Sequence, residues 1–256
     1  MKQWTLAALL LCTAMGTSQF VLASTNNSND YLEAAAALEA GEPYPAFLKA
    51  VAGSRSNDPG AMALVAKAYL FGQGTIKHYA TAVTHYEKAA ALNYPPAQFA
   101  LARLLEVGLG AKQDPERAAK LMLSAADQGL AWAMFSIAMY FENGTGVTKD
   151  IQSAYKWYSL AADFLPMGND GLGKEAGTKR DSLLQSLSPT QKTDAEREIR
   201  AWKRVKRTID PNWTRKASEL PSLESEIAAL RNAQSRPPAP KDPRDSLSST
   251  YFPKNN

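Results

Sequence analysis

The chain has 256 residues, of which 45% are hydrophobic and 21% charged, a composition that is ordinary for a folded protein of one or two domains. Its formal net charge is +4, or +3 without residues 1–23, which include Lys2. Either charge is too small to attract nucleic acid. The one cysteine, Cys12, lies in that same segment, so a chain without it forms no disulfide and has no thiolate chemistry.

Residues 1–23 have the pattern of a secretory signal peptide. Lys2 precedes an apolar stretch over residues 6–15, and Val21 and Ala23 stand at the −3 and −1 positions of a cleavage site. Two alternatives are cleavage after Gly16 and an uncleaved membrane anchor, although polar residues interrupt the apolar run and spanning takes about 20 apolar residues. We therefore expect an exported protein, periplasmic or secreted beyond the cell.

Residues 30–60 are expected to be helical. The segment from Tyr31 to Ala40 is rich in alanine, and a second helix is expected from about Ala46 to Ala52. This pair is interpreted either as a degenerate N-terminal repeat, without the glycines described next, or as a helical cap.

Residues 61–168 repeat three times with a period of 36 residues. In each unit small and apolar residues recur at a helical spacing, which predicts first helices over 61–71, 97–107 and 133–142. A Gly-x-Gly pair ends each of them, because glycine tolerates the positive φ of a helix C-terminus. Such a period indicates a stacked array, since one unit cannot bury its apolar face alone. The pairs are Gly72/Gly74, Gly108/Gly110 and Gly144/Gly146.

A second helix is predicted in each unit, over residues 79–92, 115–128 and 151–163. Asp114 before Pro115 gives a strong start signal, with an N-cap carboxylate and a proline at the first helical position. Asp150 is the predicted N-cap in the third unit, and His78 stands at the same place in the first. Each unit is therefore predicted to be a helix–turn–helix.

The three units resemble the Sel-one-like repeat family, a helix–turn–helix solenoid related to tetratricopeptide arrays. The resemblance extends over residues 61–165. It implies an all-α fold, a right-handed superhelical solenoid, and binding of protein partners without a cofactor. The matching motifs are Tyr69-x-x-Gly72-x-Gly74, Gly108-x-Gly110-x-x-x-Asp114 and Tyr140-x-x-x-Gly144-x-Gly146-Val147-x-x-Asp150.

Residues 174–208 are expected to form helices that cap the C-terminal end of the array. Ser188 and Gln191 have the spacing of a capping box. Residues 209–256 are expected to be mostly a flexible tail, because they are rich in proline and serine and have few apolar residues to bury.

A basic run begins in the predicted cap. Residues 197–216 carry eight Lys or Arg and two acids, a balance of +6. Arg200, Arg204 and Arg207 fall on one helical face. This basic patch is interpreted either as a docking surface for an acidic partner, lipid headgroups or an anionic glycan, or as the solvated face of a capping helix.

A variable stripe on the first helices is the candidate binding surface. Its residues differ between units while their neighbours repeat, and first helices line the concave groove in tetratricopeptide-like arrays. Phe99 and Phe135 are interpreted either as groove residues or as core, whereas Arg103 and Glu106 are expected at the surface, where aromatic and Arg side chains favour binding. The whole set is Lys67, Phe99, Arg103, Glu106, Phe135, Met139 and Glu142.

Most catalytic signatures are missing from the sequence, and nothing in it marks any serine as an activated nucleophile. The Gly-x-Gly pairs follow helices, which makes them turns rather than phosphate loops. The two histidines, His78 and His85, have no third histidine nearby that would complete a zinc site. We expect no enzyme, no cofactor and no metal. The predicted function is a periplasmic scaffold or regulator that binds an envelope protein, with two alternatives, a cell-wall or envelope-polysaccharide binder and a secreted effector that binds a host or partner protein.

Overall fold

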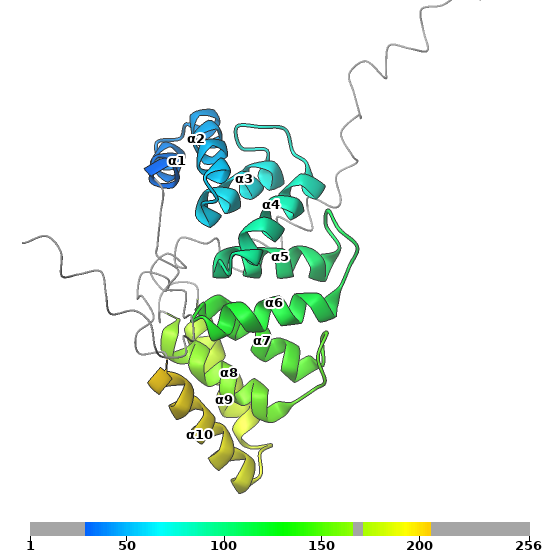
Figure 1. The fold of residues 1–256 in the computed structure, drawn as a ribbon. Helices are drawn as coiled ribbons and strands as arrows, with labels where there is room; N and C mark the ends of the chain where they lie inside the picture. Colours follow the sequence, from blue (N-terminus) through cyan, green and yellow to red (C-terminus); the bar gives the residue numbers. More distant parts are fainter. Residues whose placement is uncertain (1–28, 166–170, 206–256) are drawn as a thin grey trace, which may run out of the picture.

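The computed structural model describes residues 29–165 and 171–205, and the regular structure within them is entirely helical. From α1 to α9 each helix packs on the next, and α10 packs on α8, in an elongated array with α1 near one end and α10 at the other (Figure 1). The chain therefore folds as an all-α solenoid of helix–turn–helix repeats. The helices are α1 (Asn29–Glu39), α2 (Pro43–Arg55), α3 (Pro59–Phe71), α4 (Tyr79–Ala91), α5 (Pro95–Val107), α6 (Pro115–Asp127), α7 (Ala131–Asn143), α8 (Ile151–Phe164), α9 (Leu172–Leu184) and α10 (Pro189–Val205).

The first helices of the three repeats, α3, α5 and α7, begin two residues before their predicted starts. Asp58 explains the start of α3, because its carboxylate accepts hydrogen bonds of 2.8 and 3.2 Å from two backbone N–H groups of the first turn. Gly72 ends α3 in the left-handed conformation, with φ of 73°, which a residue with a Cβ disfavours. Gly108 and Gly144 end α5 and α7 in the same way.

The second helices, α4, α6 and α8, each begin directly after a residue whose polar side chain accepts a hydrogen bond from the first turn of the helix. Asp114 accepts at 2.9 Å before α6, and Asp150 at 3.0 Å before α8. The Nδ1 atom of His78 accepts at 3.2 Å before α4. These caps place the second helices at the same point of each unit.

The second glycine of each pair lets one repeat rest on the repeat before it. Gly146 has φ of 64°, and a Cβ there would lie 2.0 Å from the carbonyl oxygen of Pro115, the first residue of α6. In the same way, a Cβ on Gly110 would lie 2.5 Å from the carbonyl oxygen of Tyr79, the first residue of α4. Only glycine leaves room for this contact, so the turn of each repeat is fixed on the preceding second helix.

The same contact reaches the helix pair that precedes the three repeats. A Cβ on Gly74 would lie 2.1 Å from the carbonyl oxygen of Pro43, and α2 begins 36 residues before α4. The helix α1, in contrast, is joined to α2 by residues 40–42 only, whereas residues 72–78 join α3 to α4. Thus α2 occupies the position of a second helix in the 36-residue repeat, whereas α1 does not occupy the position of a first helix.

The pair α9 and α10 forms the C-terminal end of the described array. A reciprocal capping box starts α10, since the hydroxyl of Ser188 accepts from the Gln191 backbone N–H (3.3 Å) and the Gln191 amide oxygen accepts from the Ser188 N–H (3.0 Å). The helix then lies along α8 (Figure 1). Its Trp202 ring meets Trp157 and Phe164 at centroid distances of 6.4 and 5.6 Å.

One continuous apolar core runs from α3 to α10. The alanines that begin the units, such as Ala97, are fully buried and let the helix backbones come close together. Larger side chains, including Leu101, Met122 and Ile137, fill the space between them. A smaller cluster joins α1 and α2 to α3.

The predicted signal peptide (1–23) and the predicted tail (209–256) lie outside the described residues. Within 29–165 and 171–205, no helix combines the length and the apolar character that crossing a bilayer requires.

Candidate protein-binding surfaces

Phe99 and Phe135, two members of the predicted binding stripe, are core residues. Each is only 2% exposed. The ring of Phe135 makes an edge-to-face contact with Tyr158 of α8, at a centroid distance of 5.6 Å. A partner protein cannot reach these two rings, so their interpretation as groove residues is wrong.

The expectation that Arg103 lies at the surface is also wrong. Its side chain is 3% exposed and forms an ion pair with Glu106, one turn further along α5. Glu106, which is 28% exposed, also accepts a hydrogen bond of 2.6 Å from the hydroxyl of Tyr140 in α7. Burial, and then the charge of Glu106, raise the pKa of Tyr140, so this hydroxyl keeps its proton and donates it. Glu106 therefore joins two successive repeats.

Glu142, 36 residues after Glu106, makes a similar set of contacts. Its carboxylate accepts a hydrogen bond of 2.7 Å from the hydroxyl of Tyr158 and lies 3.3 Å from Nζ of Lys179 in α9. Burial, followed by the hydrogen bond to Glu142, raises the pKa of Tyr158. The third repeat is thus tied to the C-terminal helices by a carboxylate at the same position.

The remaining members of the stripe, Lys67 and Met139, are partly buried. Met139 packs against the core, and it occupies the position that Arg103 has one repeat earlier. The predicted stripe is therefore a series of contacts between neighbouring helices rather than one exposed binding surface.

The predicted basic patch is described only at Arg200, because the side chain of Arg204 and the whole of Arg207 lie outside the described part. Arg200 is exposed and lies 3.8 Å from the carboxylate of Glu196. Arg197 pairs with Asp194 at 2.7 Å. The described surface of α10 therefore has mixed charge.

The two histidines lie in different surroundings. His78 caps α4, whereas the ring of His85 stacks on Tyr69 at a centroid distance of 6.0 Å. Burial, and then the nearby charge of Lys88, lower the pKa of His85. Across residues 29–165 and 171–205, no three His, Cys, Asp or Glu side chains come together as metal ligands.

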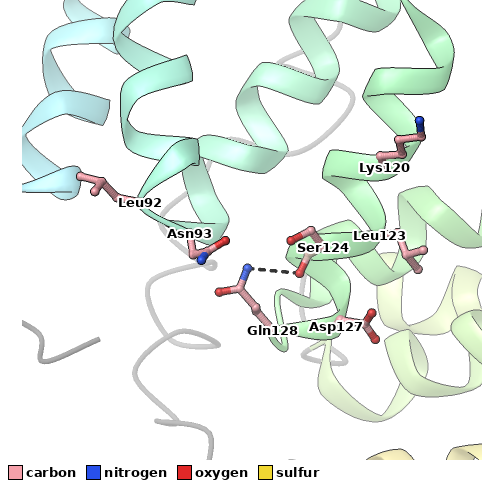
Figure 2. A pocket seen from close by; sticks show the side chains of 7 residues that line it. All are labelled: Leu92, Asn93, Lys120, Leu123, Ser124, Asp127 and Gln128. Atoms are coloured by element: carbon pink, nitrogen blue, oxygen red, sulfur yellow. Dashed lines mark hydrogen bonds between the residues drawn. The ribbon is translucent and has the colours of Figure 1, made fainter. Parts of the chain in front are cut away.

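An open hollow of about 640 Å³ lies between the C-terminal end of α4 and helix α6 (Figure 2). Leu92, which is 45% exposed, supplies apolar surface on the α4 side. Helix α6 supplies a cation, a carboxylate and a second leucine, so the hollow offers both charge signs beside apolar surface. The residues that line it are Leu92, Asn93, Lys120, Leu123, Ser124, Asp127 and Gln128.

A chain of amide side chains fixes the geometry of the hollow. The amide of Gln128 donates to Gln98 at 2.8 Å and to the backbone oxygen of Ser124 at 3.2 Å (Figure 2). The amide of Gln98, which is buried, donates in turn to Asn93 at 3.5 Å. These bonds connect the loop after α4, through Gln98 of α5, to the end of α6.

The residues of this hollow are not among the predicted binding residues, although the sequence carries a signal for two of them. Lys120 is followed by Lys156 and Asp127 by Asp163, each after 36 residues. A pair of opposite charges thus repeats in the second helices of two units.

The model of the Sel1 repeat family matches residues 59–94, 95–130 and 133–163. The chain contains three Sel1 repeats. The first two matches begin at the first residues of α3 and α5, and the third begins two residues inside α7. The match covers the region in which the turns rest on the preceding second helices.

Two curated proteins and one solved structure show how far the similarity extends. Chitin synthase regulator SKT5 of Saccharomyces cerevisiae is 32% identical over 156 residues, which are 59% of this chain and 21% of the yeast protein. Protein sel-1 homolog 2 of Mus musculus is 35% identical over 94 residues, 36% of this chain and 14% of the mouse protein. The chain thus spans about a fifth or less of these relatives. The crystal structure of a Sel1 repeat protein from Oxalobacter formigenes has a TM-score of 0.53 and 26% identity, covering 58% of this chain and 60% of that chain.

Sel1 repeats mediate interactions between proteins, and their fold is a non-catalytic scaffold. In this array, Arg103, Glu106 and Glu142 of the first helices make their contacts with other residues of the array itself. Surfaces for a partner must therefore be sought on the exposed parts of the array.

Proposed function

We propose that this protein is an exported, non-catalytic scaffold whose Sel1 repeats bind a partner protein of the cell envelope. The hollow between α4 and α6 is the observation that carries the proposal. It is lined by an exposed leucine, Leu92, and by two exposed charged residues, Lys120 and Asp127. Apolar surface with a polar rim is typical of protein interfaces. The signal-peptide pattern of residues 1–23 supports export.

Fractionation of cells that produce the full-length chain with a C-terminal tag tests the export. We expect the tagged protein in the periplasm, with Ser24 as its first residue by mass spectrometry. A cytoplasmic protein that retains residues 1–23 would contradict the proposal. Recovery from the growth medium would instead favour a secreted effector.

Crosslinking in intact cells tests the binding of a partner. A photoreactive side chain in place of Leu92 is expected to crosslink to one envelope protein, because this residue is exposed in the hollow. The control carries the same group in place of Arg197, which is exposed on α10. No crosslink from either position, or equal crosslinks from both, would contradict binding at the hollow.

A further inference from the structure

The contact between α10 and α8 shows how a second helix of this array receives an amphipathic helix. Nζ of Lys156 in α8 lies 3.0 Å from the carboxylate of Glu198 in α10. Two turns along α8, Asp163 forms an ion pair with Lys203 of α10. Trp202, which lies between Glu198 and Lys203 in the sequence, packs against the aromatic rings of α8. Helix α10 thus presents a carboxylate, an apolar ring and a cation.

The same pair of charges stands one repeat earlier, on α6. Lys120 and Asp127 lie 36 residues before Lys156 and Asp163. Both are exposed, and neither forms an ion pair with another described residue. The first repeat has Thr84 at the position of Lys120, so α4 lacks this pattern. Of the three repeats, the third carries a charge pair that forms ion pairs with α10, and the second carries one that forms no ion pair with another described residue.

The hollow lies beside this open pair. Lys120 and Asp127 both line it, and they belong to the α6 side (Figure 2). Leu92 and Leu123 provide apolar surface there, whereas the place of Phe164 is taken by Gln128. The hollow therefore offers leucines rather than aromatic rings to the apolar residue of an incoming helix.

We infer that the hollow between α4 and α6 binds an amphipathic helix of a partner protein in the way that α10 binds α8. The partner helix places a carboxylate against Lys120, a cation five residues later against Asp127, and a large apolar side chain against Leu92 and Leu123. The inference rests on the proposed scaffold function and specifies the chemistry of its partner. Charge complementarity sets the direction of the helix, because reversing it places like charges together.

A peptide with the sequence of residues 189–205 is the probe, since it carries Glu198, Trp202 and Lys203 at the required spacing. Fluorescence anisotropy with the labelled peptide and the full-length protein, freed of its signal peptide, is expected to give saturable binding. The double charge swap Lys120→Glu with Asp127→Lys is expected to weaken binding at least tenfold. A peptide with Glu198→Lys and Lys203→Glu is expected to restore binding to this variant and to bind the wild type poorly.

The matched control is Lys149→Glu with Glu39→Lys, which also keeps the net charge and changes two exposed residues elsewhere. It is expected to bind the peptide as the wild type does. Circular dichroism checks that the variants unfold at the temperature of the wild type, because all four positions are at the surface.

Three results would overturn the inference. The first is no binding of the peptide to the wild type. The second is binding that ignores the swap at Lys120 and Asp127 but is lost with Lys156→Glu, since the peptide would then replace α10 on α8. The third is a dimer, seen by sedimentation, that dissociates on the same swap, since the occupant would then be a second copy of the chain.

The scaffold function is tested separately by the crosslinks in cells. An envelope partner that still crosslinks to the double variant, together with a peptide that does not bind, would leave the scaffold function standing and remove the helix-binding hollow. If the peptide binds as expected but the cells yield no crosslinked partner, the helix-binding hollow stands and the scaffold function is removed.

Discussion

The hydroxyl of Tyr140 donates a hydrogen bond of 2.6 Å to Glu106, and these two residues belong to the first helices of successive repeats. The same carboxylate faces Arg103, a cation that is almost completely buried. Glu106 is thus the common partner of a neutral donor from the next repeat and a charged donor from its own. Replacing Glu106 therefore removes both the ion pair and the hydrogen bond, whereas replacing Tyr140 removes only the hydrogen bond.

The variant Glu106→Gln is expected to lower the free energy of unfolding by about 2–3 kcal/mol, because it leaves the buried charge of Arg103 without its anion. The variant Tyr140→Phe removes one hydrogen bond and is expected to cost about 1 kcal/mol. Urea denaturation of both variants and of the double variant measures these changes. Since the two residues are in contact, their effects should differ from a simple sum by at least about 0.5 kcal/mol. Strict additivity would show that the contact contributes nothing.

Gly146→Ala is expected to destabilise the chain more than Gly144→Ala. Both glycines have positive φ, so each substitution carries the cost of a left-handed conformation, about 1–2 kcal/mol. At Gly146 the new Cβ would also lie 2.0 Å from the backbone of Pro115, whereas at Gly144 its nearest neighbour is at 3.5 Å. Thermal denaturation of the two variants separates backbone strain from the clash between repeats. Equal melting temperatures would contradict the role of Gly146 as a contact between repeats.

His85 is expected to make the stability of the chain depend on pH. Burial lowers its pKa in the folded chain below the ordinary value of 6.5, so the unfolded chain binds a proton first as the pH falls. The stability that the neutral ring contributes is therefore complete above about pH 6.5 and is lost as the pH falls from there to the lower pKa of the folded chain. Urea midpoints from pH 7.5 to pH 5 should fall less for His85→Gln than for the wild type. An identical fall would mean that other groups cause it.

Trp202→Ala is expected to release α10 from α8 while the repeats stay folded. Trp202 supplies the ring contacts between these two helices, whereas α5 and α6 have their own core contacts. Hydrogen exchange should show at least tenfold faster exchange of the α10 amides and little change in α5 and α6. The control is Arg197→Ala, an exposed residue of the same helix, which should leave the exchange of α10 unchanged. Faster exchange throughout the array would show that α10 is part of one cooperative unit.

The positions of the helices could be predicted because they depend on local signals. The glycine pairs and the caps Asp114 and Asp150 act within one turn of the helix that they end or begin. The predicted starts of the first helices were two residues late, since the alanine that repeats most clearly lies inside the helix rather than at its start. At α3 the actual start signal is Asp58, whose carboxylate caps the first turn.

The surroundings of Arg103 could not be predicted from its variation between repeats. Variation from unit to unit at a position predicts a residue that is free of packing. In the structure the partners vary as well, because Arg103 meets Glu106 in its own helix while the third repeat takes the cation Lys179 from α9. Variation within a chain therefore does not distinguish an exposed position from one whose neighbours change with it.

The hollow could not be predicted from one repeat, because two repeats form it. Leu92 follows α4, the second helix of one unit, and Lys120 and Asp127 belong to the next unit. The repeated charges were visible in the sequence, but the structure was needed to show that the later pair forms ion pairs with α10, whereas the earlier pair forms none with another described residue.

The contact of Gly146 with Pro115, and of Gly110 with Tyr79, restricts how such a chain can lengthen during evolution. Each contact joins two residues that are 31 positions apart, so the glycine and the residue that it contacts belong to different copies of the repeat. Duplication of a whole 36-residue segment copies both the glycine and the helix start that the next glycine contacts, so every turn keeps its contact with the preceding second helix. A partial duplication brings a residue with a side chain opposite the backbone of the preceding helix, and the array loses its contact at that point. Gene duplication in steps of one complete period is the path that preserves the fold.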